Sequence, residues 1–198
     1  MSLITLPKMM VSDNDGWSDI VRMHPTATKL MLYFVMPMSL IPPLMYAYAQ
    51  LVHPGVVFAL VLPPLTGGEA LLVGAMFFLV ELAMVLLMAA YIQELGGVAD
   101  IHPDYAKAFT LAAIAPTPLW LSALALFVPS LWFNVLVVVA AWLGSVALVR
   151  HGVRALLRVR SEENARRLTK LITVTGAAVW IGLMLLLTMI LGMVLGWR

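Results

Sequence analysis

The chain contains no cysteine and few charged residues. The absence of cysteine from all 198 residues excludes disulfides, thiolate catalysis and thiolate metal sites. Charged residues make up only 11% of the chain and hydrophobic residues 63%, whereas soluble domains usually have roughly 25% charged and about 45–50% apolar residues. A soluble fold of this length has no means of burying so many apolar side chains. The composition therefore indicates a protein that a lipid bilayer solvates.

The cations that are present are concentrated in one stretch. Seven of the twelve Lys and Arg residues lie between Arg150 and Lys170, and long apolar segments flank them. Such a cluster is typical of a cytoplasmic loop of a membrane protein. Nucleic-acid binding needs cations spread over a polar face, so we expect no nucleic-acid partner.

Five apolar segments are long enough to cross the roughly 30 Å hydrocarbon core of a bilayer. We predict an all-α membrane protein, a bundle of five transmembrane helices occupying residues 29–198 after a short polar cytoplasmic tail, residues 1–28. The predicted spans are about 29–51, 69–93, 105–127, 131–149 and 171–195. The apolar run Val56–Leu65 is too short to cross and is expected to be re-entrant or interfacial.

Prolines interrupt the first and third spans, and we predict a kink in each. The prolines are Pro37, Pro42, Pro43, Pro116 and Pro118. Each removes a backbone donor and clashes with the preceding turn. Two interpretations stay open for the first span, a packing kink and an unwound segment that exposes carbonyls to a solute.

The cation count also predicts the orientation. With five spans, the N-terminal tail and the second–third and fourth–fifth connections share one side, with three, one and seven Lys and Arg residues. The other side has only Arg198. The positive-inside rule then places the N-terminus in the cytoplasm and the C-terminus outside.

Glu81 is the one charged residue deep in a predicted span. A carboxylate at this depth is costly, so the side chain should be neutral, paired or facing water. Two readings stay open, a protonated Glu81 hydrogen-bonded to a neighbouring helix and an intramembrane proton or cation site. Its candidate partners on other spans are Tyr46, Tyr48, Thr117 and Ser122.

The first half of the basic run predicts an arginine-bearing extension of the fourth span. Arg150, Arg154 and Arg158 share one helical face at i, i+4 and i+8, and with Arg160 they form a candidate surface for anionic lipids or a partner. Ser161 followed by two acids predicts the start of the next helix. Glu162 and Arg166 are spaced for an i, i+4 ion pair.

Other motifs give weaker predictions. Asp100, His102 and Asp104 are metal-ligand types, but no fourth ligand is in view, so we expect a solvated loop and no metal. No Ser/His/Asp set or metalloprotease motif is visible; we expect no catalytic residues, no cofactor and no enzyme activity.

Gly192-x-x-x-Gly196 permits close helix contact and is a candidate homo-oligomer motif. Three tryptophans are candidate interface anchors, namely Trp120, Trp132 and Trp142.

Residues 105–195 resemble the Yip family of integral membrane proteins, in its small bacterial form. The matching features are the Ala-rich third span with the run from Pro116 to Trp120, the turn at Pro129, the fourth span and the basic connection into the last span. Gly96-Gly97 after the second span and His24-Pro25 before the first match more loosely.

The resemblance implies five spans with a cytoplasmic N-terminus and, for this form, location in the bacterial inner membrane. Eukaryotic members associate with Rab GTPases, but their long tail and Asp-Leu-Tyr-Gly-Pro signature have no counterpart here, which argues against a GTPase partner. The function we expect is a non-enzymatic membrane-organising protein that binds lipids or a partner. The alternative is a small transporter or channel that uses Glu81 as its ion site.

Overall fold

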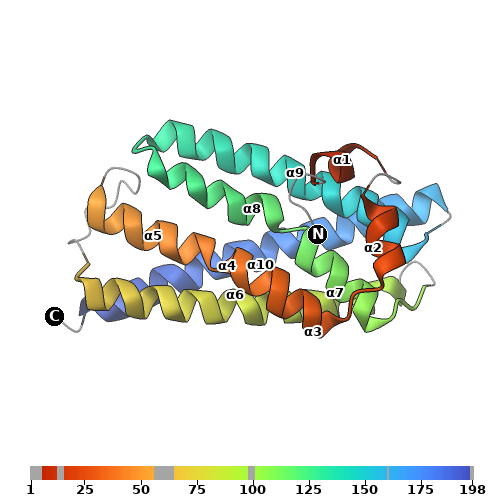
Figure 1. Ribbon diagram of the computed structural model, residues 1–198, viewed down its shortest axis with the longest axis horizontal. Coiled ribbons are helices and arrows are strands. Elements are labelled where there is room, and N and C mark those ends of the chain that lie inside the picture. The colour runs from red at the N-terminus through yellow and green to blue at the C-terminus, as the bar shows by residue number, and fades with distance from the viewer. Residues whose placement is uncertain (1–5, 13–15, 56–64, 98–100, 160, 197–198) are drawn as a thin grey trace.

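The computed structural model contains helices and no strands in the residues it describes, which are 6–12, 16–55, 65–97, 101–159 and 161–196. Five helical segments are long and apolar enough to cross a membrane. They are Ala27–Val52, Gly67–Gly96, Tyr105–Phe127, Leu131–Leu157 and Glu162–Gly196. They run in alternating directions along the long axis of the molecule (Figure 1). The predicted all-α fold with five membrane-spanning helices is confirmed.

Two of the five segments are divided into shorter helices. The first consists of α3 (Ala27–Leu30), a π-helical turn (Met31–Val35), α4 (Met36–Ser39) and α5 (Ile41–Val52). The third consists of α7 (Tyr105–Ile114), α8 (Thr117–Ser122) and a 3₁₀ turn, η4 (Ala123–Phe127). The other three are the single helices α6 (Gly67–Gly96), α9 (Leu131–Leu157) and α10 (Glu162–Gly196).

The divisions lie beside prolines, which cannot donate a backbone hydrogen bond to the preceding turn. Pro37 and Pro42 stand in the first turns of α4 and α5, and Pro116 separates α7 from α8. The bend that each proline produces stays a prediction.

The first half of the basic run is helical as far as Leu157, so the predicted helical face holds Arg150 and Arg154 but not Arg158. Helix α9 continues to Leu157, past the predicted end of the span, and carries Arg150 and Arg154 on its last turns. Arg158 ends the helix in the left-handed conformation at φ 54°. Helix α10 then begins at Glu162, where the Ser161 hydroxyl accepts a hydrogen bond from the backbone N–H of Asn164 at 3.4 Å.

Part of the segment predicted as a short polar tail, residues 1–28, packs against the bundle. Helices α1 (Leu6–Val11) and α2 (Trp17–Met23) lie against α9. Trp17 is fully buried, and its indole N–H donates to the Met9 carbonyl at 3.0 Å. Its ring packs over Gly152, where a Cβ would lie 2.7 Å from the Trp17 Cη2. The acidic residues of this segment obscured the apolar positions between them.

The interior forms two apolar clusters, and much of the remaining apolar surface is exposed. The larger cluster joins α1, α2, α7 and α9 with the adjacent ends of α6 and α10; the smaller one joins α5, α6 and the last turns of α10. Leu71, Leu136 and Leu185 are each more than 60% exposed. Leucines in these positions on spanning helices are expected to face lipid.

Candidate functional site

Cationic side chains gather at one end of the bundle. Because the five segments alternate in direction, the start of α3, α7 and α10 and the end of α9 meet at the same end, together with α1 and α2 (Figure 1). These elements and Arg158, the residue directly after α9, carry every Lys and Arg of the residues that the structure describes. The charge asymmetry predicted from the sequence is therefore also an asymmetry of the folded molecule.

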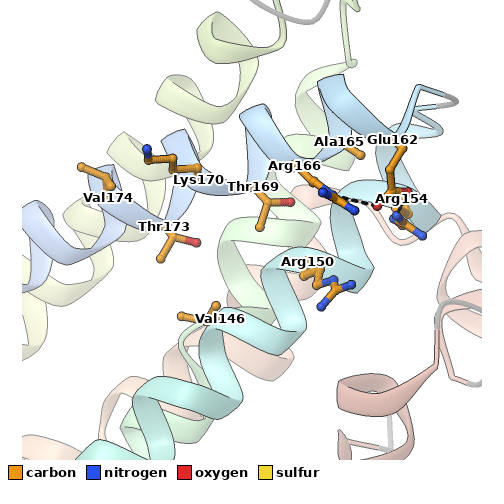
Figure 2. A pocket seen from close by; sticks show the side chains of 10 residues that line it. All are labelled: Val146, Arg150, Arg154, Glu162, Ala165, Arg166, Thr169, Lys170, Thr173 and Val174. Atoms are coloured by element: carbon orange, nitrogen blue, oxygen red, sulfur yellow. Dashed lines mark hydrogen bonds and ion pairs between the residues drawn. The ribbon is translucent and has the colours of Figure 1, made fainter.

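An open groove of about 450 Å³ runs between α9 and α10 at this end. Figure 2 shows its ten lining side chains, which come from these two helices alone. They are Val146, Arg150, Arg154, Glu162, Ala165, Arg166, Thr169, Lys170, Thr173 and Val174. Four cations and one acid give the groove a net positive charge.

Glu162 joins the two walls of the groove. Its Oε2 forms an ion pair with the Arg154 guanidinium on α9, and its Oε1 accepts from Arg166 Nε on α10 at 3.1 Å. Two guanidinium groups from different helices thus converge on one carboxylate. Arg150 and Lys170 line the same groove, and neither forms an ion pair within the described part of the chain.

The groove changes character along its length. Arg154, Glu162 and Arg166 lie at the mouth, near the end of the bundle, while Val146 and Val174 lie further along the helices (Figure 2). Thr173 lies at the apolar part, and its hydroxyl oxygen has no hydrogen-bond partner among the described residues. A charged mouth that continues into an apolar trough fits a molecule with an anionic head and an apolar chain.

The structure changes the membership of the predicted arginine surface. Arg150 and Arg154 line the groove, but Arg158 lies exposed beyond the end of α9 and does not line it. Arg160 falls outside the described residues. Arg166 and Lys170 from α10 contribute instead. The sequence could have predicted this contribution, because Glu162, Arg166 and Lys170 are spaced i, i+4, i+8. That spacing places the three side chains on one face of a helix.

Glu81 lies inside the bundle on α6. Its side chain is only 6% exposed, and its hydrogen-bond partner is the Trp120 side chain on α8. Its Oε2 has no partner among the described residues. Among the described residues, the carboxyl group therefore meets a neutral indole donor and no cation.

The predicted partners of Glu81 are engaged elsewhere. The Tyr46 hydroxyl accepts from Gln50 Nε2 at 3.2 Å. The hydroxyls of Thr117 and Ser122 donate to backbone carbonyls within the third segment, each at 2.7 Å. Tyr48 makes edge-to-face ring contacts with His53 and Phe127.

Trp120 was predicted to anchor the chain at the membrane interface, and that prediction was wrong. The side chain is 4% exposed and lies against Glu81. Trp132, in contrast, is 77% exposed, as an anchoring residue needs. The sequence alone could not tell which of the two tryptophans is buried, because they lie on either side of the same turn, residues 128–130. An indole can act as an interface anchor or as a buried hydrogen-bond donor.

The acidic loop after α6 caps a helix. Asp104 accepts from the Lys107 backbone N–H at 2.9 Å and pairs with its ammonium group at 2.8 Å. These bonds to Lys107 lower the pKa of Asp104 from its ordinary value. Asp100 lies outside the described residues, within which no group of three or more His, Asp and Glu side chains is placed to hold a metal.

The structure says little about two further predictions, the re-entrant or interfacial run and the helix-contact motif of α10. Residues 56–64, which include most of the predicted re-entrant or interfacial run, lie outside the described residues. Gly192 and Gly196 lie on α10, and a Cβ built at either one would meet nothing within 4 Å. Close approach of a second helix at this motif is sterically open.

The comparisons with known proteins give one result. A family model described as the Yip1 domain matches residues 7–195. No curated protein and no solved structure matches the chain. Since the matched region covers nearly the whole chain, this five-helix membrane protein belongs to the Yip1 domain family.

Proposed function

We propose that this protein is a non-enzymatic organiser of the membrane that binds anionic lipid headgroups through the α9–α10 groove. In this proposal the N-terminus and the groove face the cytoplasm and the C-terminus lies outside, as the distribution of cations favours. The proposed location is the bacterial inner membrane, as expected from the family resemblance.

One observation carries the proposal. In a chain of which only 11% is charged, four cations from two helices line a single open groove at the end of two spanning segments. An ordinary loop meets the positive-inside rule with scattered cations and needs no groove. Each cation near an anionic membrane surface contributes about 1 kcal/mol of attraction, so the groove is the strongest anion-attracting feature among the described residues.

The test measures lipid association of the full-length protein. The protein is reconstituted into nanodiscs of phosphatidylcholine with increasing phosphatidylglycerol, and the enrichment of bound anionic lipid is measured after purification. Replacing Arg150 and Lys170 by Gln removes two cations, and at about 1 kcal/mol each this should lower the enrichment about thirtyfold.

The matched control removes the same charges elsewhere. Lys8→Gln with Arg167→Gln also removes one Lys and one Arg, neither of which lines the groove. The control should keep most of the anionic-lipid enrichment. Equal losses in the two double variants would mean that total charge alone is at work, and the proposal would be wrong.

The second candidate is a small transporter or channel that uses Glu81. The observation in its favour is the unpartnered Oε2 of a buried carboxyl group inside the bundle. Proton or cation flux into liposomes, compared between wild type and Glu81→Gln, tests it. No wild-type flux, or flux that Glu81→Gln leaves unchanged, would remove this candidate.

A further inference from the structure

We infer that the groove is a binding site for one glycerophospholipid with a phosphomonoester headgroup, and that Glu162 occupies the headgroup position until the lipid displaces it. The inference rests on the proposed function and narrows it from a charged surface to a defined ligand. Phosphatidate is the simplest lipid of this class.

The headgroup position is indicated by the two ion pairs of Glu162. Arg154 and Arg166 approach a single carboxylate from two helices, which is the arrangement of a site built around an anion. Arg150 lies on the same wall as Arg154, one helical turn away, and also lines the groove. Two guanidinium groups therefore hold one carboxylate, and a third arginine lines the same groove.

A phosphomonoester matches this set better than the carboxylate does. It carries a charge of about −1.5 to −2 at neutral pH and three strong acceptor oxygens. Arginine forms bidentate, charge-assisted hydrogen bonds with such a group. A phosphodiester carries a single charge, as Glu162 does, so it competes with Glu162 on nearly equal terms. The internal carboxylate thus makes the groove selective for the more highly charged headgroup.

The trough beyond the headgroup position fits the rest of a lipid. Val146 and Val174 supply apolar walls further along the helices, at the side where an acyl chain would lie. The Thr173 hydroxyl is enclosed, borders this part of the groove and has no hydrogen-bond partner among the described residues. Free phosphate would leave the apolar walls unused.

The experiment compares lipids and variants by native mass spectrometry of the full-length protein in detergent. Phosphatidate, phosphatidylglycerol and phosphatidylcholine with the same acyl chains are added in turn, and glycerol 3-phosphate is the chain-free headgroup. The wild type should bind one phosphatidate, in preference to phosphatidylglycerol, and glycerol 3-phosphate should not displace it at equal concentration.

Glu162→Gln is the decisive variant. It removes the internal competitor, so phosphatidylglycerol should bind about tenfold more tightly, the factor expected when a competing charged hydrogen bond is lost, and the preference for phosphatidate should shrink. Glu163→Gln is the matched control, because Glu163 lies in the same first turn of α10 and does not line the groove. Arg150→Gln should lower phosphatidate binding, whereas Arg167→Gln should not. Circular dichroism of each variant verifies that the helices are intact.

The possible outcomes distinguish failure of the phosphomonoester-lipid inference from failure of the proposed function. Equal binding of phosphatidate and phosphatidylglycerol, with both above phosphatidylcholine, would overturn the inference and leave the proposed function standing. Equal effects of Glu162→Gln and Glu163→Gln would overturn the role of Glu162. Glycerol 3-phosphate binding as tightly as phosphatidate would overturn the lipid assignment. Equal binding of all three lipids would overturn both the inference and the proposed function.

Discussion

Two glutamates of this protein have the same functional group and opposite surroundings. Glu81 lies inside the bundle, with a neutral indole as its hydrogen-bond partner and one oxygen without a partner among the described residues. Glu162 lies at the mouth of an open groove, between two arginines. Desolvation without a counter-charge makes ionisation costly at the first position, while two cations stabilise the carboxylate at the second.

The difference supports the proposal that the groove, and not the bundle interior, binds an anionic ligand. A buried, sealed carboxyl group serves helix packing unless water reaches it, whereas a carboxylate shared by two arginines in an open groove can be exchanged for another anion. We therefore propose that Glu81 has a structural role and that the groove at Glu162 binds a ligand. The following predictions test that assignment, starting with the largest expected effect.

Truncating the partner of Glu81 should damage the fold most. Trp120→Ala removes a buried indole and the hydrogen bond to Glu81, and the cavity alone should cost about 3–5 kcal/mol of unfolding free energy. Trp132→Ala is the control, because that side chain is 77% exposed. Unfolding in detergent, followed by circular dichroism, measures both. A similar loss in the two variants would show that Trp120 has no special packing role.

Filling the space between Gly152 and Trp17 should have the next largest effect. A Cβ at Gly152 would lie 2.5 Å from Leu111 Cδ1 and 2.7 Å from Trp17 Cη2, so Gly152→Ala should cost about 1–3 kcal/mol by overpacking. Since Gly152 lies between Arg150 and Arg154, the shift of α9 should also weaken lipid binding. Gly182→Ala, with nothing within 4 Å, is the control. Unchanged stability of Gly152→Ala would contradict the packing of Trp17 onto α9.

Replacing Glu81 by an amide should change little. Glu81→Gln keeps the shape of the side chain and an oxygen that accepts from Trp120, so the unfolding free energy should change by about 1 kcal/mol or less. Lipid enrichment in nanodiscs should equal that of the wild type. A loss of several kcal/mol would mean that Glu81 is charged and paired in the folded protein.

The smallest effect is expected at Asp104, a carboxylate in water. Its folded-state pKa is lowered by Lys107, so its ionised form stabilises the fold above the unfolded pKa of about 3.9, and this contribution is lost as the pH falls through the lower folded value. Asp104→Asn should therefore melt slightly below the wild type at pH 5 and together with it near pH 2. A difference that is constant over this range would exclude the ionic contribution.

Sequence reasoning predicted the features that depend on composition and period. Long apolar runs gave the five spanning helices, and the spacing of Arg150 and Arg154 placed both on one face of a helical extension, as the structure has them. The helix start at Ser161 and the pair of Glu162 with Arg166 also followed from local rules of capping and i, i+4 spacing.

The features that sequence reasoning missed depend on contacts between segments. Nothing local identifies Trp120 as the partner of Glu81, since the two residues are brought together only by the packing of α8 near α6. The docking of Trp17 onto Gly152 joins positions more than a hundred residues apart. The groove needed both α9 and α10 to be placed, and only then did Arg166 and Lys170 join the arginines of α9.

The most direct test of the assignment measures lipid binding and ion flux on the same reconstituted preparations. The variants are Glu81→Gln and the groove variant, Arg150→Gln with Lys170→Gln. The account predicts that the groove variant loses anionic-lipid enrichment, that Glu81→Gln keeps it, and that no preparation shows flux above protein-free liposomes. Wild-type flux that Glu81→Gln abolishes, together with unchanged lipid enrichment in the groove variant, would contradict the account.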